Sequence, residues 1–241
     1  MSGWKAKRFW KAARVVALED GFGISLDGRP VRTPAKAPLC LPSRAMAEAV
    51  AAEWDAQQGE IRPASMPLTR AANTAIDSVR HQRRAVAEAI AAYADSDLLC
   101  YRATAPRELV RRQAEGWDPL LDWAQARYGA RLVRVAGVMH APQPPEALAR
   151  LAEAVHVMDP FALTALHDLV ALSGSLVIGL AAIESVAAPE ALWRLSRIDE
   201  TWQEEQWGTD ALARAQAAAK EKDFLAAKRF HDLARAKTGG G

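Results

Sequence analysis

Two neighbouring ionisable residues, His167 and Asp168, lie on a largely apolar stretch of the sequence. A histidine in that setting is able to act as a general base or as a metal ligand. The alternative is a satisfied core or interface histidine, which the lack of further partners favours. Both interpretations stay open at the level of the sequence.

The densest acidic group lies between Arg197 and Gly208 and consists of Asp199, Glu200, Glu204 and Glu205. Glu200 and Glu204 are four residues apart, so a helix places them on one face. Such a pair suits a divalent cation or a paired acid and base if a cleft lies beside it. No histidine lies within a turn of the pair, which favours a solvated helix face. Together with His167 and Asp168, this pair defines the alternative function of a metal-dependent or hydrolytic enzyme.

The usual catalytic motifs are missing from the sequence. It contains neither a G-x-x-x-x-G-K-[ST] phosphate loop nor a G-x-G-x-x-G after a strand, and neither an H-E-x-x-H pair nor a G-x-S-x-G elbow. Cys40 and Cys100 match no metal-ligand spacing, and the apolar neighbours of Cys100 indicate a buried structural thiol. The sequence therefore gives no positive signal for nucleotide hydrolysis, zinc binding or acyl transfer.

Tryptophan is the most frequent aromatic residue, and it accompanies the acidic group. The eight tryptophans are Trp4, Trp10, Trp54, Trp117, Trp123, Trp193, Trp202 and Trp207. Trp193, Trp202 and Trp207 share one predicted helix with the carboxylates. Indoles supply contact area and carboxylates supply selectivity, so this combination is typical of a protein-recognition surface. We expect most of the tryptophans in the core and a minority in one exposed patch.

Composition excludes several classes of protein. The 241 residues are 25% charged and 50% hydrophobic with a net charge of +2, which excludes disorder and gives no field strong enough for nucleic acid or anionic membrane as the main partner. The most apolar run, residues 169–183, is shorter than the roughly 20 residues of a membrane span, so we expect no membrane insertion. Basic segments at 5–14 and 220–237 leave a nucleic-acid module as a further hypothesis, although the latter also fits an amphipathic surface helix.

The first 41 residues predict a β-meander. Apolar and aromatic residues at 9–18 and 22–26 indicate two strands, and Asp27-Gly28 is a hairpin dipeptide. Prolines flank two short pieces, 31–33 and 39–41, which predicts edge strands. Helices are then expected from a Ser43 cap to Gly59, at 68–79 and at 81–93, and a short strand at 98–102 that returns to the sheet.

From residue 105 onward the pattern is almost wholly helical. Helices are expected at 107–128 with a kink or restart at Pro119, and at 145–158, 160–183, 189–207 and 209–237. Small residues at Ala171, Ser175 and Gly179 predict close approach of a neighbouring helix. We therefore predict an α+β protein with a mixed α/β domain at 1–104 and a helical domain at 105–241.

Six segments in order resemble one family: Phe9-Trp10-Lys11, Leu26 to Pro34, Glu53 to Gln57, Met66 to Thr69, Asn73 to Asp77 and Trp117 to Leu121. A C-terminal signature follows, with Leu195 to Glu200 leading to Gln203 and to Trp207-Gly208. The sequence resembles the assembly chaperones that hold the alpha subunit of the ATP synthase F1 sector, the ATP-twelve family of mitochondria and alphaproteobacteria. Residues 209–241 depart from the family pattern, and nothing is carried over to them.

The resemblance implies a non-enzymatic role without cofactor or metal. The family member binds the newly made alpha subunit and masks the surface that later meets the beta subunit. Glu200 matches the family's C-terminal acidic position, and we group it with Asp199, Trp202, Glu204 and Trp207 as the expected partner-binding residues. We expect structural roles for four other motif residues: Asp27, Gly28, Trp54 and Trp117.

The first 18 residues lack the serine-rich character of an organelle presequence. This favours a bacterial cytoplasmic member, whereas eukaryotic relatives would work in the mitochondrial matrix. A monomer is compatible with the sequence.

Overall fold

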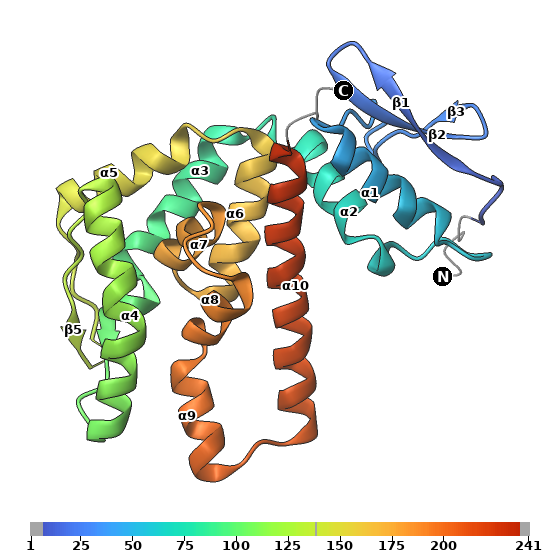
Figure 1. Ribbon diagram of the computed structural model, residues 1–241. Helices are drawn as coiled ribbons and strands as arrows, with labels where there is room; N and C mark the ends of the chain where they lie inside the picture. The colour runs from blue at the N-terminus through green and yellow to red at the C-terminus, as the bar shows by residue number, and fades with distance from the viewer. Residues whose placement is uncertain (1–6, 138, 237–241) are drawn as a thin grey trace. The chain divides into compact units, whose positions relative to one another are not determined.

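The computed structural model describes residues 7–137 and 139–236 and has an α+β fold (Figure 1). The chain forms two compact units. The first, here called the N-terminal unit, holds the residues up to 83 together with 160–164 and those from 229 on. The second, the helical unit, holds 84–159 and 165–228.

A three-stranded antiparallel sheet begins the N-terminal unit, with β2 (Gly21–Leu26) between β1 (Ala13–Leu18) and β3 (Arg29–Pro30). The predicted hairpin is confirmed, because Asp27 and Gly28 both have positive φ angles of 47° and 89°. The expected strands at 31–33 and 39–41 are wrong in extent. The structure reduces them to single bridges, from Arg32 to Pro38 and from Phe22 to Leu41.

Helix α1 (Arg44–Asp55) packs against this sheet, and Ser43 caps it by accepting a 3.0 Å hydrogen bond from the Met46 amide. Met46 and Val50 of this helix and Ile24 of β2 are buried in the core of the N-terminal unit. The helix ends at Asp55, before the predicted stop at Gly59. A 3-10 turn at Pro63–Ser65 leads to α2 (Pro67–Thr74), which continues as a π-helical turn over Ala75–Val79.

The helical unit opens with α3 (Arg83–Ala91) and two 3-10 turns, Ala92–Ser96 and Leu98–Cys100. The short strand β4 (Tyr101–Arg102) does not return to the N-terminal sheet, which corrects the prediction. It pairs in parallel with β5 (Val135–Ala136). Helix α4 (Arg107–Tyr128) runs through Pro119 without a restart.

Helices α5 (Pro145–His156), α6 (Pro160–Ser173) and α7 (Leu176–Ile183) follow. The single helix expected at 160–183 is wrong, because Gly174 has a φ of 70° and Ser175 caps a new helix by accepting from the Ile178 amide. Helix α7 is almost wholly buried. The close approach predicted at Gly179 is confirmed, since a Cβ there would lie 2.5 Å from a Val170 methyl group.

The chain then forms α8 (Pro189–Ser196), α9 (Ile198–Trp207) and α10 (Ala211–Arg235). The helix predicted at 189–207 is interrupted at Arg197. In α10, Phe224 and Phe230 are buried, which supports the amphipathic interpretation of this segment. Among the described helices, none is long and apolar enough to cross a membrane.

Candidate functional site

Helix α9 carries all five expected partner-binding residues, and two polar contacts hold it against α4. The Gln113 amide donates a 2.6 Å hydrogen bond to the Asp199 carboxylate, and Arg112 donates a 2.7 Å hydrogen bond to Glu205. The Arg112 guanidinium also lies 4.9 Å from the ring centroid of Trp202. Asp199 and Trp202 therefore attach α9 to its own fold.

Arg112 is a fixed positive charge in this attachment. Hydrogen bonds with Glu205 and then Glu108 raise the pKa of Arg112 above its ordinary value. The guanidinium thus remains charged at any physiological pH, and it joins carboxylates of α4 and α9.

Glu200 and Glu204 share one face, as predicted, and both contact Arg197. The guanidinium lies 3.1 Å from a Glu200 oxygen and 3.3 Å from a Glu204 oxygen. Arg197 itself is only 20% exposed, whereas Glu200 remains 48% exposed. The enzyme hypothesis places a metal cation between these two carboxylates. In the structure the Arg197 guanidinium contacts both of them instead. Within residues 7–137 and 139–236, no group of three His, Cys, Asp or Glu side chains is arranged to hold a metal ion.

Trp207 completes the exposed part of this helix. Its side chain is 79% exposed, and no residue of α9 is fully buried. We call Glu200, Glu204 and Trp207 the α9 surface. An exposed indole beside partly neutralised carboxylates is able to bind another protein, because it offers apolar area and charge in one place.

The base of α9 depends on two neighbouring residues of α4, Gly116 and the motif residue Trp117. Gly116 lets the α8–α9 junction approach closely, since a Cβ there would lie 2.8 Å from Ile198 and 2.9 Å from Leu195. Trp117 is fully buried and donates a 2.7 Å hydrogen bond to the Leu195 carbonyl. Trp117 thus connects α4 to the end of α8 from within the core.

His167 lies on the surface, so it is not a core histidine, and of the expected core or interface role only the interface role stays a prediction. Its ring nitrogen is 3.0 Å from the Asp168 carboxylate, and this hydrogen bond raises the pKa of His167. Cys100 is buried, and burial raises its pKa to about 12, which confirms a structural thiol. Burial also raises the pKa of Cys40. None of these groups is an activated nucleophile.

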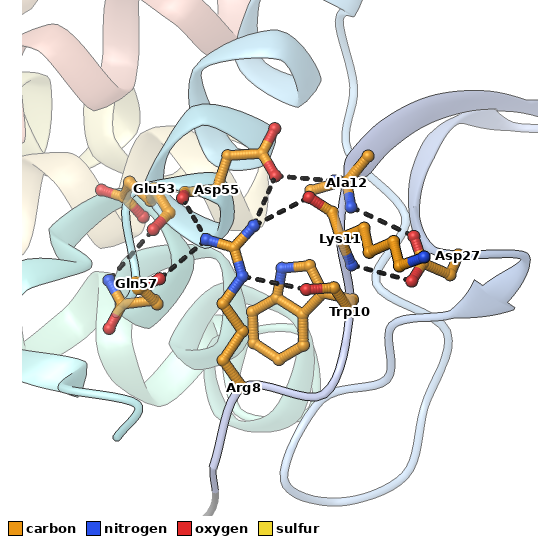
Figure 2. A network of polar contacts seen from close by, with 9 residues as sticks. Arg8, Trp10, Lys11, Ala12, Asp27, Glu53, Asp55 and Gln57 are labelled. Carbon is orange, nitrogen blue, oxygen red and sulfur yellow. Dashed lines mark hydrogen bonds and ion pairs between the residues drawn. The ribbon is translucent and has the colours of Figure 1, made fainter. Parts of the chain in front are cut away.

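The N-terminal motifs meet around Arg8, whose guanidinium bonds four backbone carbonyls (Figure 2). These are the carbonyls of Trp10, Lys11, Asp55 and Gln57, at 3.0, 2.9, 2.6 and 2.7 Å. Arg8 thereby fastens the segment before β1 to the end of α1. This use of Arg8 weakens the nucleic-acid hypothesis for the basic N-terminal segment.

Asp27 acts on the same segment from the hairpin. Its carboxylate accepts hydrogen bonds from the amides of Lys11 and Ala12, and these bonds lower its pKa (Figure 2). The ring of Trp54 lies 5.3 Å from that of Trp10 in an edge-to-face arrangement. The structure thus gives Asp27 and Trp54 intramolecular contacts of the structural kind.

Fewer tryptophans are buried than expected, because only three of the seven in the described residues lie in the core. Trp10, Trp117 and Trp193 are buried, and Trp54, Trp123 and Trp202 are half-buried. Trp207 is the one exposed tryptophan of the described residues, and Trp4 lies outside them.

Sequence reasoning missed the residues that position these groups. Arg8, Arg112 and Gln113 act across 47, 93 and 86 residues of chain, and no local pattern reveals such pairings. A signal did exist for Asp97, which caps the turn at Leu98–Cys100 by accepting from the Leu99 amide. An aspartate immediately before an apolar run is a typical cap.

Comparisons with known proteins agree with this picture. Residues 7–125 match the family model described as ATP12 chaperone protein. The crystal structure of Atp12 from Paracoccus denitrificans is similar at 50% identity with a TM-score of 0.92, and the match covers 95% of this chain and 99% of that one. A candidate chaperone from Agrobacterium tumefaciens is similar at 46% identity with a TM-score of 0.89, over 94% of this chain and 85% of that one.

These matches extend over nearly the whole chain at about half identity, well beyond the level at which only a fold is shared. The sequence motifs, the α+β architecture and the relatives lead to one assignment. The chain belongs to the ATP12 chaperone family, whose members assist the assembly of ATP synthase.

Proposed function

We propose that this chaperone binds the unassembled alpha subunit of the F1 sector and covers its beta-contacting surface until assembly. The family assignment establishes a chaperone and not an enzyme. An unassembled subunit of an obligate ring exposes a large apolar interface, and such a surface aggregates unless another protein masks it. We propose that the chaperone does this in the bacterial cytoplasm.

The exposure of Trp207 is the observation that carries the proposal for the site. An indole that is 79% exposed contributes little to the stability of its own fold, yet it offers a large apolar area to a partner. Glu200 and Glu204 lie on the same helix and favour a client surface with compensating positive charge. Asp199 and Trp202 support this surface from behind through Gln113 and Arg112.

The enzyme hypothesis has no comparable support. Arg197 lies between Glu200 and Glu204, and His167 pairs with its sequence neighbour on an open surface. Neither pair is part of a set of groups converging on a substrate.

The decisive experiment measures binding of the purified chaperone to isolated alpha and isolated beta subunits. We expect binding to alpha and not to beta. Trp207→Ala and Glu200→Lys should each weaken alpha binding about tenfold or more, the effect of a residue near the centre of an interface.

Matched controls exist in the same unit. Val157→Ala truncates a residue that is 74% exposed. Glu153→Lys reverses the charge of an exposed residue that, like Glu200, pairs with a nearby arginine. Both control variants should bind alpha like the wild type. Equal binding to alpha and beta, or no binding to alpha, would contradict the proposed function. Loss of binding in the controls as well would contradict the proposed site.

A further inference from the structure

The outer edge of strand β1 has unpaired backbone groups. On the inner edge of the sheet, Phe22 exchanges two hydrogen bonds with Leu41, and the Ile24 carbonyl accepts from Val31. Successive residues of a strand direct their peptide groups to opposite edges. Gly23 and Ser25 therefore face β1.

The register of the β1–β2 pair shows which residues of β1 bond to β2 and which face away from it. Val16 lies opposite Gly23, and Arg14 lies opposite Ser25, so these two residues bond to β2. The peptide groups of the intervening Ala13, Val15 and Ala17 face away from the sheet. Ala13 confirms this geometry, since its amide donates a 2.8 Å hydrogen bond to the Asp55 carboxylate beyond the edge.

Beyond Ala13 the edge is open. Within residues 7–137 and 139–236, the outward amides and carbonyls of Val15 and Ala17 have no hydrogen-bond partner. Figure 1 shows β1 at the side of the sheet away from β3. We call the outward peptide groups of Val15 and Ala17 the open edge. Their alternate spacing matches one kind of ligand, an extended polypeptide segment that adds to the sheet as a strand.

This edge has little of the usual protection against strand addition beyond the charge of Arg14 and the Asp55 cap on Ala13. Natural sheets protect edges with proline, lysine, bulges or a covering element. Over Ala13–Leu18 the register is continuous and the side chains are apolar except for Arg14. The side chains of Val16 and Leu18 lie beside Gly23 and fill the place that a larger side chain would take there. Leu18 is 41% exposed. The two side chains add an apolar surface beside the open edge.

Charges at the two ends of β1 define the segment further. Lys11 and Arg14 are exposed near its start, and Glu19 and Asp20 are exposed just after its end. Within the part of the chain that the structure describes, none of these four side chains makes an ion pair. We infer that the open edge of β1 binds an extended apolar segment of the unassembled alpha subunit, with an acidic residue opposite Arg14 and a basic residue opposite Glu19.

This inference rests on the proposed function, because it names alpha as the owner of the segment. A second copy of the chain would offer the same backbone chemistry. However, an edge of two free residues with two apolar neighbours buries far less than the roughly 1,200 Å² of a stable dimer. A client that is already held by the chaperone needs only a weak additional contact here, because the second contact is then intramolecular.

Residue-resolved hydrogen exchange of the full chain, with and without purified alpha subunit, tests the inference. In the free protein the Val15 and Ala17 amides should exchange quickly, and those of Arg14 and Val16 slowly. Binding of alpha should slow the exchange of the Val15 and Ala17 amides by about tenfold or more. The exchange of the Arg14 and Val16 amides should be nearly unchanged. This alternation distinguishes strand addition from general burial.

Ala17→Pro removes one outward donor without removing a bond to β2, and Val16 before it is already extended, as proline requires. It should weaken alpha binding about fivefold, the effect of one net hydrogen bond. Ala17→Val is the matched control, since it keeps the amide and should bind like the wild type. The wild-type exchange measurement decides the question even if Ala17→Pro does not fold.

The outcomes separate the two proposals. Binding of alpha with unchanged exchange at Val15 and Ala17 overturns the open-edge inference and leaves the proposed function intact. No binding of alpha to the wild type overturns both. Slowing of the two amides in the chaperone alone, together with a doubled mass, identifies a second copy as the occupant and also overturns the inference.

Discussion

Glu53 illustrates how a motif residue serves the fold through backbone hydrogen bonds. One carboxylate oxygen accepts from the Leu68 amide and the other from the Thr69 amide, each at 2.8 Å. The Thr69 hydroxyl adds a third bond of 2.7 Å. These amides belong to the first turn of α2, which lacks a side-chain cap of its own. Glu53 therefore caps α2 from α1.

Glu53→Ala should lower the free energy of unfolding by about 1 to 2 kcal/mol, the usual cost of losing a helix cap. Glu48→Ala, which removes an exposed carboxylate paired with Arg44 in the same helix, should change it by less than about 0.5 kcal/mol. Urea titration of both variants measures the difference. Equal effects would show that the α2 cap contributes nothing.

Asp97 gives the helical unit a pH dependence. It is fully buried and accepts from the Leu99 and Val177 amides, each at 3.0 Å. Burial raises its pKa from 3.8 to about 6, although hydrogen bonds from Val177, Ser175 and Leu99 act in the opposite direction. Between these two values the native state keeps a proton that the unfolded chain releases. The contribution of Asp97 to stability is therefore greatest below about pH 4 and falls as the pH rises through 6.

The stability difference between the wild type and Asp97→Asn measures this contribution, because asparagine does not titrate. We expect this difference to become less favourable to the wild type by about 3 kcal/mol between pH 4 and pH 7.5, at about 1.4 kcal/mol per pKa unit. Urea unfolding at several pH values provides the measurement. A difference that is independent of pH would contradict the assignment.

At the scale of elements, α9 differs from its neighbours in how it is held. Helix α8 buries Leu192 and Trp193, whereas α9 has no buried residue and relies on Arg112 and Gln113. Exposed ion pairs contribute at most about 1 kcal/mol and are screened by salt. Within the helical unit, the amides of α9 should therefore be the ones whose protection from hydrogen exchange depends most on salt.

Hydrogen exchange at 0.05 M and 1 M NaCl tests this expectation. Amides of α9 should exchange about threefold faster at high salt, a change equivalent to part of one ion pair. Amides of α8 should be unchanged. The same acceleration in both helices would indicate a general effect of salt and contradict a polar attachment of α9.

Helix starts were the elements best predicted from sequence, because the signals are local. The prolines at 145, 160 and 189 and the Ser43 cap each mark a start where the structure has one. The break at Gly174 was missed because the apolar stretch 160–183 predicts one continuous helix, in which Ser175 was taken only as a small packing residue. In fact Gly174 adopts a positive φ and Ser175 caps the next helix. The partner of β4 was missed because it lies more than 30 residues away in sequence.

The candidate site shows the same limit. The acidic and aromatic character of α9 was evident from the sequence, and so was the shared face of Glu200 and Glu204. The roles of Arg197 and Arg112 were not evident, because arginine at those positions also suits a solvated helix. Only the fold shows that these arginines neutralise part of the acidic group and that Trp207 beside it is exposed.

At the scale of the whole molecule, stability and client binding should depend on different residues. The core of the helical unit holds Trp117, which is fully buried and hydrogen-bonded to Leu195. The α9 surface holds Glu200, which is exposed and, among the residues that the structure describes, forms an ion pair with Arg197 alone. A chaperone that must later release its client benefits from this separation, since changes on the binding surface do not unfold the protein.

Trp117→Ala should lower the free energy of unfolding by about 3 to 5 kcal/mol, because it leaves a large cavity and an unpaired Leu195 carbonyl. Glu200→Lys should change it by less than about 0.5 kcal/mol while weakening alpha binding. Thermal and urea unfolding of both variants, with binding measured well below each melting temperature, tests the separation. If Glu200→Lys lost stability in proportion to binding, the carboxylate would be part of the fold, and the client would have to bind elsewhere.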